Sequence, residues 1–402
     1  MQKYISYFGG DPSRVTAFGQ SAGAASVSTH MIANGGKLNG LFSGAIMQSG
    51  SASNYPRFEP ADTRPEQVYS DLLAAAQCAD LACLTSMDAQ ALNMAQGVVI
   101  KKWVSPFVPV IDPFFFPTPP SFAFQSGAVA DIPFIAGTVQ DDGTFQTSAR
   151  TVATDADLAE FLSLHYGNQT SFGLGLLEQL YPANPSAGCP FSTQRFGVPA
   201  SDPIFAAQYK RTAAIVTDLL FLAPKRMQLN GAINNKQKSK CWSYLFAQRG
   251  VYNDVGLGIT HASDVPFAFA NPPLSDSPSV PQDQTDGLLA TLLAAWKHNG
   301  GAGSAKRAHA AASSSSSSAA ASASAALVAD INLTSKMMVA SWLAFAYNRD
   351  PNVANVVPNW PAYDAQGLAS MQWQGSNTSV IRDDFRKLQT DMFIDNPFTW
   401  WI

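Results

Sequence analysis

Apolar and polar residues follow two kinds of pattern along the chain, and the order of the patterns predicts an α/β protein. Short apolar runs bounded by Pro, Gly or polar residues are typical of buried strands. Such runs lie at residues 15–18, 45–48, 132–138 and 241–247. Apolar residues three or four positions apart are typical of helices, and they recur at residues 23–32, 65–77, 155–164, 208–230 and 333–348. Because the two kinds alternate, we expect a mostly parallel sheet flanked by helices.

The first ten residues resemble the end of an amphipathic helix. Tyr4, Ile5 and Phe8 would share one face, and Gly9 and Gly10 would end the helix. This start indicates an N-terminally truncated chain, although a short N-terminal helix fits equally well. An apolar segment followed by a cleavage site is absent here, so we expect no signal peptide.

One segment departs from both patterns. From residue 308 to residue 326 every residue except His309 is Ala or Ser. Serine competes with the helical backbone, and the segment has no apolar face to bury. We therefore predict a disordered surface insertion over residues 300–327. Residues 1–402 as a whole are expected to be the C-terminal portion of a single domain.

The amino-acid composition argues against several classes of protein. The chain has 402 residues, 13% charged residues and a net charge of −4. Phosphate backbones are bound by clustered positive charge, so we expect no nucleic-acid partner. The sequence contains no run of 18 apolar residues, so no transmembrane segment is expected. Its 4 cysteines are too few for a disulfide scaffold.

Gly19, Ser21 and Gly23 form a Gly-x-Ser-x-Gly motif between a predicted strand and a predicted helix. In this context the serine is held in a strained turn at the end of the sheet. The N–H of Ala22, at the helix start, would point to the oxyanion of an acyl-transfer intermediate. The motif predicts a serine nucleophile; a structural Gly/Ser turn is the alternative.

Residues 8–23 (FGGDPSRVTAFGQSAG) and 41–51 (LFSGAIMQSGS) resemble the type-B carboxylesterase family, which includes fungal lipases and cholinesterases. The resemblance extends over nearly the whole chain outside residues 300–327. It implies an α/β-hydrolase fold, with a serine nucleophile, an acid and a histidine in that chain order.

The base is chosen from 5 histidines. His261 follows a strand and a glycine-containing loop, and residues 257–267 (LGITHASDVPF) resemble the family's Gly-x-x-His-x-x-Asp stretch. The other histidines lie on a helix, beside a turn or next to the Ala/Ser segment: His30, His165, His298 and His309. We therefore predict His261 as the base. Asp264 would either brace this loop or be a solvated turn carboxylate.

The acid is expected between the serine and the histidine. A buried strand at residues 132–138 leads into Asp141 and Asp142 before a glycine turn. The family pattern there is Asp-Glu-Gly-Thr, with Glu as the acid, which assigns the acid to Asp142 and leaves Asp141 as the competitor. All three candidates follow predicted parallel strands, where the sites of such sheets lie.

Two further residues near this site can be compared with the family: Gln20 departs from its pattern and Ser49 matches it. Gln20 stands where many relatives carry Glu, which removes a negative charge and disfavours a cationic substrate. Ser49 resembles a family serine that hydrogen-bonds near the acid; a plain Ser in a turn is the alternative.

Aromatic residues could line an apolar acyl pocket, namely Phe107, Phe145 and residues 114–116, although aromatics at such positions are usually core. By resemblance, Cys78 and Cys83 form a small disulfide loop, while Cys189 and Cys241 would be free. If the chain is secreted, Asn168, Asn332 and Asn377 are candidate glycosylation sites.

Family members carry a long segment before the position of Met1, with the first sheet strands and a Gly-Gly pair of the oxyanion hole. Only the Ala22 N–H corresponds to an oxyanion donor here. Loss of one donor costs about 10²–10³ in rate. We therefore expect little or no esterase activity and ready aggregation from the chain as written, and hydrolysis of p-nitrophenyl esters once that segment is restored.

The favoured hypothesis is a serine carboxylic-ester hydrolase that acts on apolar esters through Ser21, His261 and Asp142, without a metal or organic cofactor. The resemblance also implies secretion and contact with a lipid surface. The alternatives are a non-catalytic binding homologue on the same fold and an inactive fragment.

Overall fold

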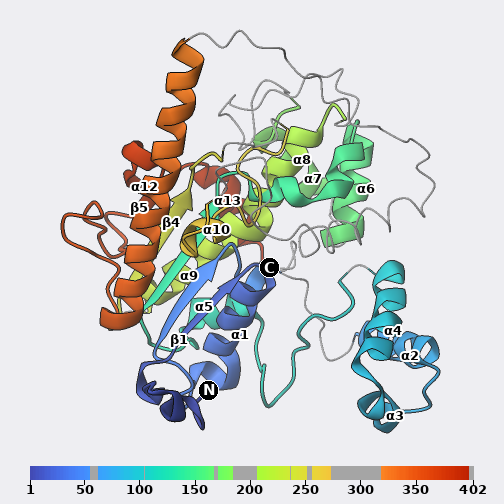
Figure 1. Cartoon of the computed structure of the whole chain (residues 1–402). Coiled ribbons are helices and arrows are strands. Elements are labelled where there is room, and N and C mark those ends of the chain that lie inside the picture. Colours follow the sequence, from blue (N-terminus) through green and yellow to red (C-terminus); the bar gives the residue numbers. More distant parts are fainter. Residues whose placement is uncertain are drawn as a thin grey trace.

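A β-sheet forms the centre of the molecule (Figure 1). The computed structural model describes residues 1–54, 62–103, 105–166, 171–183, 206–235, 237–250, 256–272 and 318–397. Within these residues, six strands pair in the order β1-β2-β3-β4-β5-β6. Their bounds are Thr16–Gln20, Gly44–Gln48, Phe134–Val139, Cys241–Phe246, Ala369–Trp373 and Ser379–Arg382. β1 to β5 are parallel and β6 is antiparallel to β5, so the expected mostly parallel sheet is confirmed.

The four predicted strands correspond to β1, β2, β3 and β4 of the structure. β2 and β3 are buried along their whole length, as expected for parallel strands that are covered on both faces. The apolar pattern did not predict β5 or β6. β6 is mostly exposed, and β5 mixes Ser and Gln with apolar residues.

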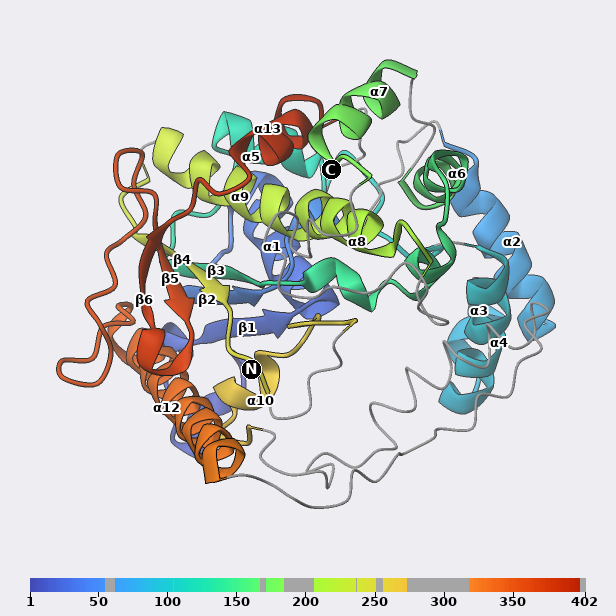
Figure 2. The same cartoon turned by 90° about the horizontal axis from the view of Figure 1, so that it is seen from above.

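Helices cover both faces of the sheet (Figure 2). One face carries α1 (Ala22–Gly36), α5 (Pro120–Ser126), α8 (Tyr209–Thr217), α9 (Ala223–Asn234) and α13 (Lys387–Asp395). These helices share an apolar cluster with side chains of β2, β3 and β4, among them Met47 and Phe134. The opposite face carries α10 (Val265–Ala268) and α12 (Ser318–Asn348). Its cluster contains Trp242 and Trp342, so the sheet separates two cores.

The predicted helix at residues 208–230 is interrupted. Between α8 and α9 the residues Asp218–Leu222 form a π-helical turn. Such turns occur mostly as single insertions within α-helices, often at functional sites. The turn places Phe221 against the candidate site described below.

Two predictions for irregular regions need correction. Ile5–Phe8 is a 3₁₀-helix instead of an α-helix, although it does end at Gly9, whose φ is 77°. Phe8 is 84% exposed, so the predicted apolar face is not buried. Residues 318–327 form the first turns of α12, so the disorder predicted for them is wrong. Alanine favours helix, and the apolar remainder of α12 anchors these turns; residues 300–317 lie outside the described residues.

A separate group of helices lies beside the sheet domain, made of α2 (Arg64–Ala76), α3 (Leu81–Ser86) and α4 (Ala89–Lys102) (Figure 1). The Cys78–Cys83 disulfide joins the end of α2 to α3, which confirms that pairing. Cys241 is a buried free cysteine, whereas Cys189 lies outside the described residues. The remaining helices are α6 (Asp155–Tyr166) and α7 (Ser171–Leu180). Among the described helices, none is long and apolar enough to cross a membrane.

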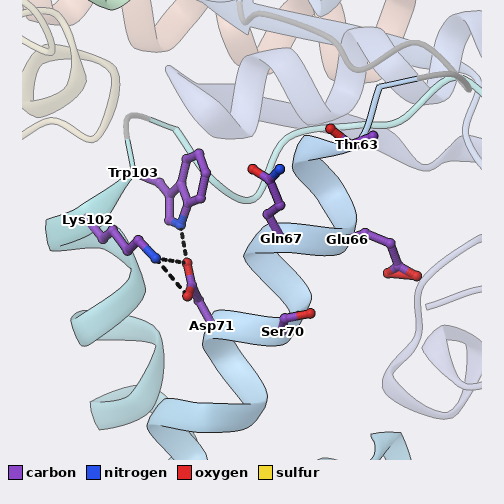
Figure 3. A pocket seen from close by; sticks show the side chains of 7 residues that line it. All are labelled: Thr63, Glu66, Gln67, Ser70, Asp71, Lys102 and Trp103. Atoms are coloured by element: carbon purple, nitrogen blue, oxygen red, sulfur yellow. Dashed lines mark hydrogen bonds and ion pairs between the residues drawn. The ribbon is translucent and has the colours of Figure 1, made fainter.

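A surface pocket lies between α2 and α4 (Figure 3). Inside it, Asp71 accepts hydrogen bonds from Lys102 Nζ at 2.8 Å and Trp103 Nε1 at 2.6 Å. These bonds join the two helices. No residue predicted for catalysis lines this pocket, so it is not the candidate active site.

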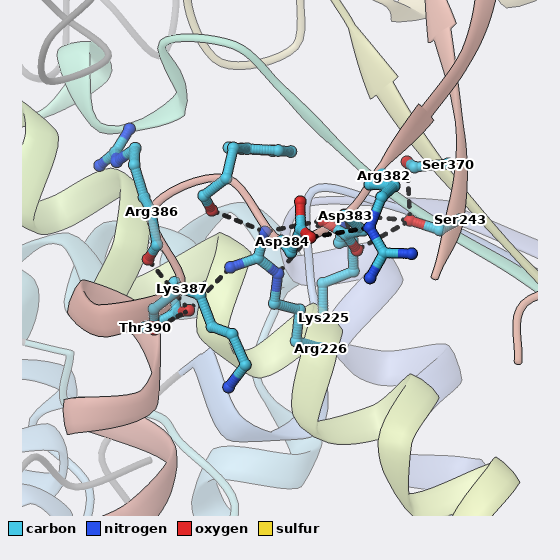
Figure 4. A network of polar contacts seen from close by, with 11 residues as sticks. Lys225, Arg226, Ser243, Ser370, Arg382, Asp383, Asp384, Arg386, Lys387 and Thr390 are labelled. Carbon is cyan, nitrogen blue, oxygen red and sulfur yellow. Dashed lines mark hydrogen bonds and ion pairs between the residues drawn. The ribbon is translucent and has the colours of Figure 1, made fainter. Parts of the chain in front are cut away.

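A buried charge cluster ties α9 to the segment between β6 and α13 (Figure 4). Asp383 pairs with Lys225 at 2.9 Å and with Arg226 at 2.9 Å. Burial alone would raise the pKa of Asp383, but the two cations outweigh burial and lower it. Arg226 also donates to Thr390 Oγ1 at 2.7 Å, and Asp383 accepts from Ser243 Oγ at 3.2 Å. The cluster fixes α9 against the sheet and, through it, the π-helical turn.

Candidate active site

Ser21 lies in a sharp turn at the carboxyl end of β1. Its φ of 55° and ψ of −122° are outside the regions that L-residues favour. A Cβ on Gly19 would lie 2.3 Å from the Gly23 carbonyl carbon, so Gly19 is required sterically. A Cβ on Gly23 would meet open space, so among the two glycines of the motif the steric requirement falls on Gly19. The turn places Ser21 directly after the carboxyl end of β1.

His261 faces Asp142. The Nδ1 atom of His261 lies 2.7 Å from Oδ1 of Asp142, which is fully buried. The other carboxylate oxygen accepts hydrogen bonds from Ser49 Oγ at 2.9 Å and from the Val139 N–H at 2.9 Å. The carboxylate of Asp142 is therefore held on both oxygens.

Asp141 has a different position. Its Oδ2 accepts the Ile259 N–H at 2.8 Å, and its own N–H donates to the Ile259 carbonyl at 3.0 Å. A short parallel bridge also pairs Asp141 with Thr260. Asp141 thus anchors the backbone of the loop that carries His261, while Asp142 contacts the ring.

Asp264 is buried, so its interpretation as a solvated turn carboxylate is wrong. It is at the start of α10 and accepts a hydrogen bond from Tyr244 Oη at 2.7 Å. Burial raises the pKa of Asp264 to about 6. The contact joins the His261 loop to β4, as expected for a bracing residue.

The remaining sides of the His261 ring are also occupied. Gln20 Nε2 lies 3.2 Å from Nε2 of His261. The rings of Phe145 and Phe221 each lie 4.9 Å from the imidazole, measured between ring centroids. Among the described residues, the hydrogen bonds of the ring go to Asp142 and Gln20, and Ser21 Oγ makes none to it. A serine nucleophile with His261 as its base implies a hydrogen bond between Ser21 and His261, and in this structure that bond is not formed.

The other predicted residues are distributed as follows. Ala22 is the first residue of α1, where backbone N–H groups have no intrahelical acceptor. Phe145 is 37% exposed beside His261, whereas Phe107 is 48% exposed and makes no ring contact with His261 among the described residues. Asn332 and Asn377 are exposed, and Asn168 lies outside the described residues.

The alternative histidines are not part of this arrangement. His30 is exposed on α1 and its ring meets Phe115 edge-on. His165 packs on Phe161 in α6, and burial lowers the pKa of its imidazole. His298 and His309 lie outside the described residues.

Comparison with known proteins identifies the family of the chain. The model of the carboxylesterase family matches residues 1–298. The chain is 33% identical over 285 residues to Lipase 1 of Geotrichum candidum, covering 66% of this chain and 48% of the relative. It is 29% identical over 417 residues to Secreted lipase 1 of Botryotinia fuckeliana, covering 99% of this chain and 60% of the relative.

Solved structures extend the comparison to the fold. EstA of Aspergillus niger superposes with a TM-score of 0.70 at 22% identity, covering 100% of this chain and 67% of the neighbour. The chain belongs to the carboxylesterase family and has the α/β-hydrolase fold. It spans about half to three-fifths of the length of the two curated relatives described above.

Proposed function

We propose that the chain is a serine carboxylic-ester hydrolase in which Ser21 is the nucleophile, His261 the general base and Asp142 the residue that orients the base. The observation that carries the proposal is the 2.7 Å contact between His261 and buried Asp142, at the same edge of the sheet as the strained Ser21 turn. Family membership supports ester hydrolysis as the reaction class. Residues 1–402 would act as part of one α/β-hydrolase domain.

The proposed mechanism passes through an acyl-enzyme. Ser21 Oγ bonds to the ester carbonyl carbon while its proton moves to Nε2 of His261. The alcohol leaves with that proton, and a water molecule then attacks the acyl-serine by the same proton route. Asp142 accepts the Nδ1–H throughout, which stabilises the imidazolium. The Ala22 N–H would donate to the oxyanion.

The proposed substrate is an ester with an apolar acyl group. The partly exposed Phe145 ring beside His261 offers an apolar surface at the point of reaction. Two relatives are named as secreted proteins, namely Secreted lipase 1 of Botryotinia fuckeliana and Secreted triacylglycerol lipase LIP1 of Gibberella zeae. Their names support action of this chain outside the cell. Contact with a lipid surface and glycosylation at Asn332 and Asn377 belong to the same proposal.

A fluorophosphonate probe tests this proposal, because it reacts covalently with activated serines. We expect mass spectrometry to find the probe on Ser21, and Ser21→Ala and His261→Gln to abolish labelling. Ser26→Ala, which removes an exposed serine of α1, is the matched control and should label normally. Hydrolysis of p-nitrophenyl butyrate should follow the same order. Equal labelling in Ser21→Ala would contradict the proposal.

A non-catalytic binding homologue is the second candidate. The observation in its favour is that Gln20, instead of Ser21, contacts Nε2 of His261. It predicts a folded protein in which Ser21 stays unlabelled at every probe concentration.

A further inference from the structure

The Gln20 side chain contacts the atom of His261 that base catalysis requires. A carboxylate only accepts hydrogen bonds, so the 2.7 Å contact with Asp142 fixes the proton of the neutral ring on Nδ1. Nε2 then carries a lone pair and accepts. Gln20 Nε2, at 3.2 Å, is an amide donor. The amide therefore engages the lone pair to which the Ser21 hydroxyl would donate.

We propose that Gln20 is a positioning residue that binds Nε2 of His261 in the free protein and yields that atom to Ser21 when substrate arrives. This inference rests on the proposed function for its role in catalysis. The hydrogen bond itself is independent of turnover.

Gln20 is well placed for this exchange. It is the last residue of β1 and directly precedes Ser21, so one turn carries both groups that compete for Nε2. In the sheet it pairs with Gln48, whose carbonyl accepts the Ser21 N–H at 2.9 Å. The backbone of the turn is thereby fixed, and the exchange needs side-chain rotation only.

An amide suits both protonation states of the ring. In this structure its NH₂ group lies next to Nε2, which suits a neutral ring whose proton is on Nδ1. After Nε2 has gained the serine proton, rotation of the amide presents its carbonyl oxygen as an acceptor. A glutamate at this position could only accept, and its negative charge would stabilise the imidazolium.

The imidazole itself has little freedom to move. Phe145 and Phe221 flank the ring at 4.9 Å each, and Asp142 holds Nδ1. Among the described residues, Asp264 also interacts electrostatically with the ring, and Asp264 accepts a hydrogen bond from Tyr244. Since ring rotation is blocked, the moving part is the Gln20 side chain.

The test is NMR of the full chain labelled with ¹⁵N-histidine, with His261→Gln to assign the signal. The variants are Gln20→Leu and Gln20→Glu. Gln90→Glu is the matched control, because it adds the same charge at an exposed site on α4. In Gln20→Leu, the Nε2 signal at pH 8 should move towards that of a free ring nitrogen. In Gln20→Glu, the carboxylate can only accept, so the Nε2 signal at pH 8 should move towards that of a protonated ring nitrogen, whereas Gln90→Glu should leave it unchanged.

Either an unchanged Nε2 signal in Gln20→Leu or equal Nε2 signals in the two glutamate variants would overturn the proposal. The readout requires no turnover, so it separates this inference from the proposed function. If Ser21 stays unlabelled by the fluorophosphonate while the NMR shifts occur, the proposed function fails and the Gln20 contact stands.

Discussion

Two adjacent carboxylates have different roles at the candidate site. Asp142 contacts the His261 ring, whereas Asp141 holds the backbone of the loop that carries the ring. The two residues are consecutive in the turn after β3, where Asp141 precedes a 3₁₀-helix and Asp142 begins it, and their side chains reach different partners. Variants at these two positions should therefore fail in different ways.

Asp142→Asn should lower the rate of Ser21 labelling by about 10⁴, because the amide favours the wrong tautomer of His261. Asp141→Asn should lower it by about tenfold or less, since the amide oxygen can still accept the Ile259 N–H. Labelling kinetics with a fluorophosphonate measure both. The reverse order would assign the acid to Asp141.

Asp264 should make stability depend on pH. Burial raises the pKa of Asp264 from 3.8 to about 6, so the folded protein favours the neutral acid. Its stabilising contribution is complete below about pH 4 and is lost as the pH rises through 6. From pH 4 to 7.5, the wild type should lose about 2–3 kcal/mol relative to Asp264→Asn. Urea unfolding at several pH values measures this difference.

Asp395→Asn is the control for that series, because it removes a carboxylate that is exposed at the end of α13. It should track the wild type at every pH. Parallel stability curves for the wild type and Asp264→Asn would contradict the prediction.

At the scale of elements, the buried charge cluster holds α9 in position. The π-helical turn that carries Phe221 directly precedes α9. Asp383 is the anion between Lys225 and Arg226, and all three are buried. Removing one partner of a buried pair leaves a charge without compensation. The cluster is therefore expected to set both the stability of the fold and the position of the ring beside His261.

Asp383→Ala should lower the free energy of unfolding by about 3–5 kcal/mol. Its neighbour Asp384 provides the matched control, because it pairs with Arg382 at 2.8 Å on the surface. Asp384→Ala should cost about 1 kcal/mol or less. Chemical denaturation compares the two, and equal losses would mean that the buried cations find other partners.

The sequence predicted the elements with strong apolar patterns and the residues that follow strands. It predicted β1 to β4 and the meeting of His261 with Asp142, since parallel strands end at one edge. It did not predict β6, which is short and exposed, or the π-helical turn, which leaves no mark on apolar spacing. The contact between Gln20 and His261 could not be predicted either, because it depends on a side-chain rotamer and not on the order of the strands.

At the scale of the whole molecule, β1 is an edge of the sheet formed by the described residues. Its sequence, Thr-Ala-Phe-Gly-Gln, has no charge and no proline, the usual protections of an edge strand. Phe18 is 40% exposed and stacks on Phe269 at 5.7 Å. For residues 1–402 expressed alone, we predict self-association at this edge.

Phe18→Lys should shift the chain towards monomer in sedimentation velocity runs at increasing concentration, because a charged side chain discourages pairing at an edge. Phe8→Lys is the control, since Phe8 is 84% exposed but lies outside the sheet. An equal effect of both substitutions would point to general solubility instead of the edge.

The order of the strands has a consequence for synthesis of the protein. The strands lie across the sheet in the order in which the ribosome makes them, so each new strand can dock beside one that has already emerged. Ser21 emerges first, Asp142 follows β3, and His261 comes only after β4. A nascent chain therefore carries the proposed nucleophile before the proposed base, which is added only after β4 has been made.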